Sequence, residues 1–304
     1  MIKNHSLKAW LISARPWSFP ASAMPILVSA AYLFWNGNEP DWLGVIWVLA
    51  TIVVFHAAGN TWSDYNDYVK GVDAGDTIGG TSITSGEFEP GEIKKFSILL
   101  LTIAVTSGLL LTYSYGLPVL YFGFAGFVLT LLYPWMKYRA LGDIDIFFNY
   151  SLLPLLGTSF VATGELEWGV CWLSLPVGLI TVGILHANNM RDMRHDKRAN
   201  IKTLAMKVGI RASAIIYSFE ALFPFLFVAV CAVAGVFPLM TLFVLAAVGT
   251  ALKNISMAMR FQSEGMDAIK NLDEKTAQLQ LMFSMLLSIS FIISAFLRWY
   301  GFDF

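Results

Sequence analysis

Two acidic clusters stand out in an otherwise apolar chain. The first contains Asn60, Asp64 and Asp67, and the second contains Asn188, Asp192 and Asp196. If each cluster continues a helix, spacings of three, four or eight residues place its amide and both carboxylates along one face. Each of the two helices would then present an acidic edge.

Carboxylates held so close together repel one another unless a cation lies between them. Mg²⁺ is usually held by one or two carboxylates together with phosphate oxygens of a substrate. The basic residues near the clusters would attract a polyanion; they are Lys70, Arg191, Arg194, Lys197, Arg198 and Lys202. The clusters therefore predict a site for a diphosphate bridged by Mg²⁺.

The alternative is that the acidic residues are only helix ends at a membrane interface, where charged side chains are tolerated. Two clusters with matched spacing and basic neighbours favour the site. His195 lacks a partner at zinc spacing and is expected to be a bystander. His56 and His186 are expected to pack or to form hydrogen bonds.

A third segment, from Tyr133 to Asp143, combines aromatic and basic residues between the two clusters. In a functional interpretation, Lys137 or Arg139 binds diphosphate oxygens. In the alternative interpretation, the segment is an interfacial anchor of aromatic and positively charged side chains.

The composition indicates which elements must position these residues. The 304 residues are 57% hydrophobic and 13% charged, with a mean hydropathy of +0.63, which is typical of a membrane protein. Apolar runs of about 20 residues cross a hydrocarbon core as helices, because the backbone must be hydrogen-bonded internally. The nine expected spans are 17–35, 42–62, 96–114, 117–136, 144–163, 169–188, 213–235, 237–254 and 277–298.

We therefore expect an all-α integral membrane protein, with nine transmembrane helices around a central cavity capped by cytoplasmic loops. Residues 1–304 would form one multi-pass domain. Cys171 and Cys231 lie in apolar runs and are expected to serve packing.

The distribution of Lys and Arg predicts the orientation. With nine spans, 19 of the 20 Lys and Arg residues fall on the side that holds the N-terminus and both acidic clusters, and only Arg298 falls on the other. Positive charge marks the cytoplasmic side of short loops. The N-terminus and the acidic clusters are therefore expected on the cytoplasmic side of the cell (inner) membrane.

These residues resemble the motifs of the UbiA superfamily of intramembrane prenyltransferases over essentially the whole chain. The first cluster is similar to Asn-Asp-x-x-Asp but has Ser63 where the family usually has Asn. The second is similar to Asp-x-x-x-Asp. The other segments that carry the resemblance are Ala14-Arg15-Pro16, Gly71 with Asp73, Gly79-Gly80-Thr81-Ser82 with Gly86 and Pro90, Tyr133-Pro134, Leu141-Gly142-Asp143, and Lys202-Thr203-Leu204-Ala205 with Gly209.

The resemblance implies Mg²⁺-dependent transfer of a polyprenyl group from polyprenyl diphosphate to an aromatic acceptor. Asp64, Asp67, Asp192 and Asp196 would be catalytic and hold Mg²⁺. The residues implied in diphosphate binding are Asn60, Lys70, Lys137, Arg139, Asn188, Arg191 and Lys202. Water would be excluded from the allylic cation, and the lipidic tail of the donor would lie among the apolar helices.

The acceptor is less narrowly defined. The context Asn188-Asn189-Met-Arg191-Asp192 is similar to the 1,4-dihydroxy-2-naphthoate polyprenyltransferases of menaquinone synthesis, which implies demethylmenaquinone as the product. Other acceptors of the superfamily, such as 4-hydroxybenzoate, stay open. A secondary transporter is a further alternative, but transporters place ionisable residues near the bilayer midplane, and these apolar spans are nearly free of charge.

Overall fold

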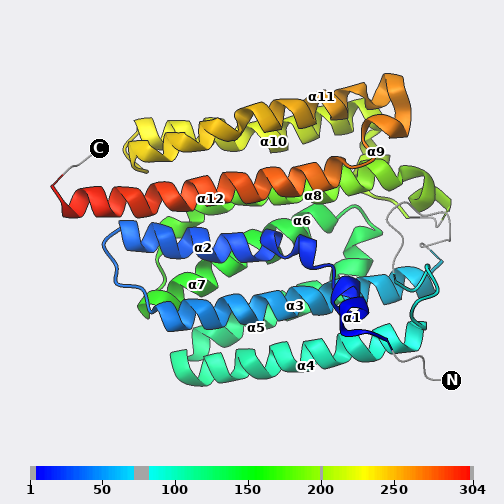
Figure 1. The fold of residues 1–304 in the computed structure, drawn as a ribbon, viewed down its shortest axis with the longest axis horizontal. Helices are drawn as coiled ribbons and strands as arrows, with labels where there is room; N and C mark the ends of the chain where they lie inside the picture. The colour runs from blue at the N-terminus through cyan, green and yellow to red at the C-terminus, as the bar shows by residue number, and fades with distance from the viewer. Residues whose placement is uncertain (1–4, 72–81, 199–200, 302–304) are drawn as a thin grey trace.

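Long helices make up most of the chain, shown as a computed structural model in Figure 1. The structure describes residues 5–71, 82–198 and 201–301, without the side chains of Arg194 and His195. The helices are α1 (Leu7–Ser13), α2 (Pro20–Trp35), α3 (Trp42–Val69), α4 (Pro90–Tyr115), α5 (Leu117–Lys137), α6 (Gly142–Phe147), α7 (Leu153–Thr163), α8 (Cys171–Arg198), α9 (Leu204–Val208), α10 (Ile210–Val233), α11 (Val248–Glu264) and α12 (Leu272–Trp299).

Nine helical segments of the described residues are long and apolar enough to cross a membrane, which confirms the predicted all-α, nine-span fold. Two spans are not regular α-helices. The fifth joins α6 to α7 through a π-helical turn at Phe148–Leu152. The eighth begins as a 3₁₀ helix at Leu239–Ala247 and continues as α11.

The helices α3 and α8 extend beyond their apolar parts, as the spacing of the acidic clusters predicted. Each contains 28 residues and is about 42 Å long at 1.5 Å per residue. A hydrocarbon core is about 30 Å thick, so their last turns can project beyond it. Those turns hold the two acidic clusters, and Figure 1 shows them at the same end of the bundle. We call this end the motif end.

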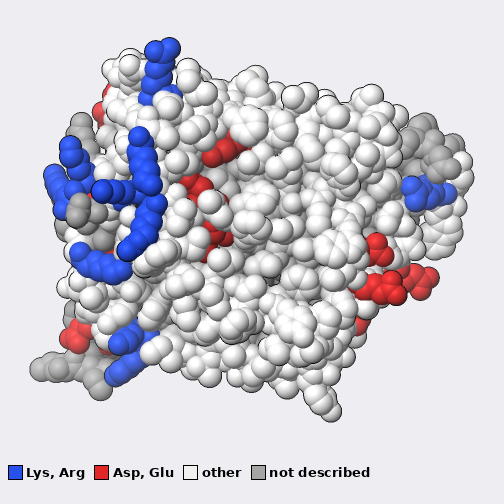
Figure 2. Space-filling view, turned by 180° about the vertical axis from the view of Figure 1, so that it is seen from behind, with Lys and Arg blue, Asp and Glu red and all other residues white. Residues whose placement is uncertain are grey.

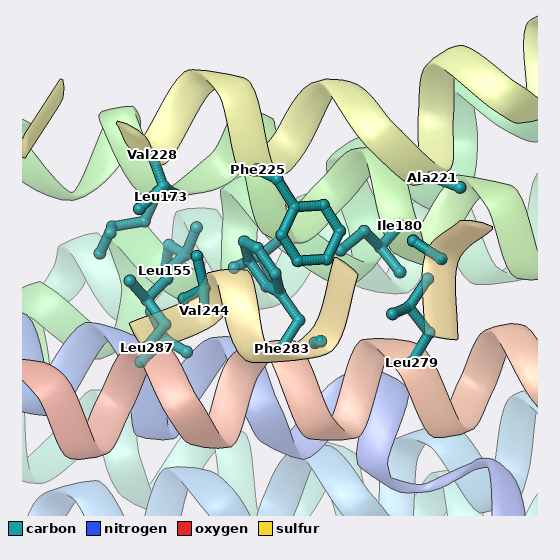
Figure 3. Packing of buried hydrophobic residues seen from close by; sticks show 14 of the residues in the cluster. Leu155, Leu173, Ile180, Ala221, Phe225, Val228, Val244, Leu279, Phe283 and Leu287 are labelled. Carbon is teal, nitrogen blue, oxygen red and sulfur yellow. The ribbon is translucent and has the colours of Figure 1, made fainter. Parts of the chain in front are cut away.

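Buried apolar side chains join the C-terminal helices into a core. The helix α12 packs on α2 and α8, and α10 packs on α8 and α11. Figure 3 shows Phe225 of α10 facing Phe283 of α12, with their ring centroids 5.1 Å apart and their planes nearly perpendicular. Leu155, Leu173 and Leu287 are fully buried in the same cluster. This packing fixes α8, and with it the second acidic cluster.

The charged side chains are distributed unevenly along the bundle. Figure 2 shows Lys and Arg side chains gathered at one end and acidic side chains prominent at the other. The end with the basic side chains is the motif end, and in this view the surface between the ends carries few charged side chains. This pattern suits a molecule whose middle lies in lipid.

Candidate active site

The carboxylates of the first cluster are buried, and each has a cationic partner. Asp64 is 5% exposed and pairs with Arg15 at 2.6 Å, and Asp67 is 7% exposed and pairs with Lys137 at 2.9 Å. The Tyr138 hydroxyl donates a second hydrogen bond to Asp67, at 2.7 Å. A buried carboxylate needs such partners, because removal from water strongly penalises an isolated charge.

Arg15 was not among the predicted site residues. It has a left-handed backbone, with φ +56°, immediately before Pro16, a conformation that costs a non-glycine residue about 1–3 kcal/mol. The Asn60 amide holds this segment, because it donates to the Ala14 carbonyl and to the Ser18 hydroxyl, each at 3.0 Å. Asn60 of the first cluster therefore helps to place Arg15 against Asp64.

The second cluster is organised around Arg191. The Arg191 guanidinium donates to Asp192 at 2.9 and 3.1 Å and to the Asn188 side chain at 2.6 Å. It also donates to Asp273 in the first turn of α12. Asp196 is 2% exposed. Asp273 was missed in the sequence, since its only signal is a charge at the start of the last helix.

The segment that follows α5 links the two clusters. Lys137, which pairs with Asp67, is also within electrostatic reach of Asp196. The backbone N–H of Lys202, a few residues after the second cluster, donates to the Tyr138 carbonyl at 3.4 Å. Asp67 and Asp196 thus act on the same cation, although they are far apart in the sequence.

The remaining predicted residues do not contact the carboxylates of the two clusters in the contacts described above. The Lys70 ammonium lies 4.1 Å from the centre of the Tyr138 ring. Within the described residues Arg139 is not brought to the acids, because its guanidinium lies over Trp135 and donates to the Trp135 carbonyl. That arrangement matches the anchor alternative for Arg139. Lys202 is exposed. The calls on Asp73, on Gly79-Gly80-Thr81 and on the side chains of Arg194 and His195 lie outside the described residues.

Tyr138 is a stable proton donor at this site. Burial and the neighbouring Asp67 carboxylate both raise the pKa of its phenol far above the ordinary value. The hydroxyl therefore stays protonated and donates to Asp67 throughout the physiological pH range.

The donor set fits Mg²⁺ that is shared with a ligand. Carboxylate oxygens are the hard ligands that Mg²⁺ prefers, and the clusters offer them in two pairs. Within the described part of the chain, no three His, Cys, Asp or Glu side chains gather closely enough to hold a metal alone. Mg²⁺ rarely occupies an all-protein cage and usually completes its coordination with water and phosphate.

His56 and His186 both form hydrogen bonds, as expected. His56 bonds to Ser22 at 2.9 Å and to Ser18 at 3.3 Å. His186 bonds to Glu220 at 3.0 Å. Glu220 lies inside the span formed by α10, so it is an exception to the expectation that the spans are nearly free of charge.

An apolar chamber of about 350 Å³ lies among α3, α4, α5 and α7. Along α3 its wall runs from Val48 to Phe55. Phe55 precedes Asp64 by nine residues, or about 13 Å along a helix axis. Gly108 and Gly123 are among the residues that line it, and a Cβ at either would meet no atom within 4 Å.

Comparisons with known proteins agree with this fold and identify a family. The model of the UbiA prenyltransferase family matches residues 22–272. The mouse (Mus musculus) UbiA prenyltransferase domain-containing protein 1 is 27% identical over 303 residues, covering 96% of this chain and 86% of the relative. The zebrafish (Danio rerio) protein of the same name is 30% identical over 246 residues, covering 77% of this chain and 72% of the relative.

Solved structures share the fold at low sequence identity. A UbiA homolog from Archaeoglobus fulgidus bound to GPP and Mg²⁺ superposes with a TM-score of 0.67 at 13% identity, covering 94% of this chain and 99% of that chain. A digeranylgeranylglyceryl phosphate synthase superposes with a TM-score of 0.60 at 21% identity, covering 95% and 98%.

Proposed function

This chain belongs to the UbiA prenyltransferase family, and from that membership we propose that it transfers a polyprenyl group from a polyprenyl diphosphate to an aromatic acceptor. The acceptor that we propose is 1,4-dihydroxy-2-naphthoate, which would give demethylmenaquinone. The support for this acceptor is the sequence Asn188-Asn189-Met-Arg191-Asp192, which resembles the naphthoate branch.

The observation that carries the proposal is the arrangement of buried acids and paired cations at the motif end. Asp67 and Asp196, from α3 and α8, both act on Lys137. Asp64 and Asp192 each pair with an arginine. Two acid pairs that face one basic segment can surround a strongly negative ligand when that ligand binds together with metal cations.

In the proposed complex, Asp64, Asp67, Asp192 and Asp196 would hold Mg²⁺, which would neutralise charge on the diphosphate. Carboxylates that bind metal release their present partners. Arg15, Lys137 and Arg191 would then turn to the diphosphate oxygens and stabilise the negative charge that develops as the leaving group departs.

The surroundings favour chemistry on an allylic cation. When the C1–O bond of the donor breaks, the cation must meet the electron-rich acceptor ring before it meets water. Asp64, Asp67 and Asp196 are buried at the end of an apolar bundle, which limits access of water. The apolar chamber near Val48 and Phe55 is the place that we propose for the distal part of the tail.

We also propose that the protein lies in the cell (inner) membrane with the motif end on the cytoplasmic side. The support is the concentration of Lys and Arg at that end. Water-soluble Mg²⁺ and released diphosphate would then exchange with the cytoplasm.

The test is a transfer assay with purified protein in lipid nanodiscs. A labelled polyprenyl diphosphate is offered with a panel of acceptors that contains 1,4-dihydroxy-2-naphthoate, 4-hydroxybenzoate and a prenylated glycerol phosphate. We expect prenylation of the naphthoate in Mg²⁺ and none in EDTA. Exclusive use of another acceptor would replace the proposed substrate, and transfer to no acceptor would contradict the proposed activity.

Matched variants assign the activity to the site. Asp64→Asn and Asp192→Asn are expected to abolish turnover while the protein still inserts and folds. The control is Glu264→Gln, which neutralises a carboxylate in an exposed ion pair with Arg260. It should leave turnover unchanged. Retained activity in either aspartate variant would contradict the site.

A further inference from the structure

His186 and Glu220 form a buried acid–base pair between α8 and α10. Their residues are 1% and 5% exposed, and His186 Nδ1 lies 3.0 Å from Glu220 Oε1. Both lie within spans of the bundle. Ionisable side chains at such positions are costly and are commonly retained for function.

The geometry determines which imidazole nitrogen can act as a base. With Glu220 ionised and the imidazole neutral, the 3.0 Å contact assigns the proton to Nδ1, which donates it to Glu220. The other nitrogen, Nε2, then has a free lone pair. Nε2 is buried and, within the described residues, has no hydrogen-bond partner. A base oriented by a carboxylate through its other nitrogen is a recurrent catalytic arrangement.

Asp143 adds a second acceptor beside this pair. It is within electrostatic reach of both His186 and Glu220. Its Oδ1 and Glu220 Oε2 are also buried without a hydrogen-bond partner among the described residues. A cluster that served only to join helices would satisfy these atoms, because each unpaired buried polar atom costs about 1–3 kcal/mol. All three unpaired atoms can accept a hydrogen bond from a hydroxyl group.

The cluster adjoins the proposed diphosphate site. Gly142 packs so closely that an added Cβ would lie 3.3 Å from Leu185 and 3.5 Å from the Lys137 backbone. Asp143 is therefore held beside Lys137, the residue that pairs with Asp67. Tyr133 lies within electrostatic reach of Lys137, Asp67 and Asp143, and His186 precedes Asn188 by two residues.

We propose that His186 is the proton acceptor for the hydroxyl group of the aromatic acceptor, with Glu220 as the positioning residue and Asp143 as a second acceptor for the same hydroxyl. This inference rests on the proposed function. It names the chemistry that the acceptor must carry, namely a ring hydroxyl that can reach Nε2 while the ring faces C1 of the prenyl donor.

The step balances as follows. Nε2 takes the hydroxyl proton, and the resulting oxyanion raises the electron density of the ring. A ring carbon forms a bond to C1 of the prenyl group as the C1–O bond breaks and its electron pair leaves with diphosphate. That carbon then gives its proton to the departed diphosphate, or releases CO₂ where it carries a carboxylate, and the ring becomes aromatic again as an oxyanion. Nε2 returns its proton to that oxygen.

Two measurements separate this role from donor ionisation. Geranyl diphosphate labelled with ¹⁸O at the bridging position reports ionisation through positional isotope exchange. Transfer to the acceptor is measured in parallel. His186→Asn retains a donor toward Glu220 but has no base at the Nε2 position, and Glu220→Gln removes the charge that fixes the tautomer. The control is Tyr217→Phe, on the same helix as Glu220. It removes a buried hydroxyl that is hydrogen-bonded to Thr276.

We expect His186→Asn to lower kcat for transfer by roughly 10²-fold or more, the usual contribution of a general base, while isotope exchange persists. The loss should be smaller for acceptors whose hydroxyl is more acidic, because these need the base less. Glu220→Gln should show the same trend, and Tyr217→Phe should show neither loss nor trend.

Four outcomes would overturn the inference. Transfer by His186→Asn at the wild-type rate would exclude the base, and loss of isotope exchange together with transfer would show general damage to the site. A loss that is equal for all acceptors would exclude proton transfer to His186. If the wild type exchanges label but prenylates no hydroxylated ring, the proposed acceptor class fails, and the base fails with it.

Discussion

At Asp67 two donors meet one buried carboxylate, the Lys137 ammonium and the Tyr138 hydroxyl. Arg139, two residues after Lys137, carries the same charge as Lys137, but its guanidinium lies over the Trp135 ring. The helix α5 ends at Lys137, so the two cations point to different surroundings. One faces the acids, and the other lies with an aromatic ring at the exposed edge of the bundle.

This difference makes Lys137 and Arg139 a matched pair for mutation. Lys137→Met should lower kcat/KM for the prenyl diphosphate by roughly 10²-fold, as the loss of one charged transition-state contact does. Arg139→Met should stay within about threefold of wild type, since an exposed cation–π contact contributes only about 0.5–1 kcal/mol. The measurement is steady-state transfer in nanodiscs. Equal losses would mean that both cations bind the diphosphate.

At this scale the sequence predicted that the acids of the first cluster lie on one helix, but it did not predict all of their partners. The spacing of Asp64 and Asp67 places them on one face of a helix, because the helical period is known in advance. No such rule applies to Arg139, which follows the end of α5 and precedes Ala140 with φ +60°. Arg15 and Asp273 reach the site from other elements, and contacts of that kind depend on packing.

At the scale of the element, α3 carries its structural cap at one end and its acids at the other. Asp41 is the N-cap and accepts from the backbone N–H groups of Leu43 and Gly44 at 3.0 and 3.1 Å. The Tyr115 hydroxyl at the end of α4 donates to the same carboxylate at 2.6 Å. One exposed residue thus fixes the start of α3 and its contact with α4.

Asp41→Ala should reduce stability by about 1 kcal/mol, the usual cost of losing a cap, seen as a lower Tm in detergent. Asp41→Asn keeps the capping geometry, so its loss of stability should be smaller. Hydrogen bonds from Tyr115 and then from the Gly44 N–H lower the pKa of Asp41. The charged form therefore stabilises the fold above the ordinary aspartate pKa of about 3.9. The difference between wild type and Asp41→Asn should shrink as the pH falls below that value, and a difference that grows would contradict this role.

The chamber between α3, α4, α5 and α7 allows a second prediction at this scale. Gly123→Leu places a side chain where a Cβ meets no atom within 4 Å. Leucine also has a higher helix propensity than glycine. Folding should be preserved while the chamber narrows. Activity with a long polyprenyl diphosphate should fall relative to geranyl diphosphate, because only a long tail reaches about 13 Å from Asp64. Gly249→Leu on α11, also in open space, is the control, and an unchanged preference would exclude the chamber as the site of the tail.

The elements themselves were predictable because a membrane helix needs a long apolar run. Their irregularities were not. Pro154 has no N–H to bond to the Tyr150 carbonyl, and the structure contains a π-helical turn just before it. A sequence pattern shows that the usual hydrogen bond is missing but does not show whether the chain kinks, breaks or widens in response.

At the scale of the whole molecule, the two ends of the bundle differ in charge. Glu39, Asp41, Glu165 and Glu167 belong to the loops of the end opposite the motifs, and Arg298 donates there to the Trp35 carbonyl. The motif end holds the acidic clusters among many more cations. An anionic substrate would therefore meet an attractive field at one membrane face only.

This asymmetry predicts the orientation, which cysteine labelling can test. In a background without Cys171 and Cys231, single cysteines are placed at the exposed positions Lys95, at the motif end, and Glu165, at the opposite end. A membrane-impermeant maleimide applied to intact cells should label Glu165→Cys, whereas Lys95→Cys should react only after permeabilisation, because positively charged loops stay on the cytoplasmic side. Labelling of Lys95→Cys alone in intact cells would reverse the orientation. It would also place the proposed diphosphate site outside the cell, on the face opposite to the one that we propose.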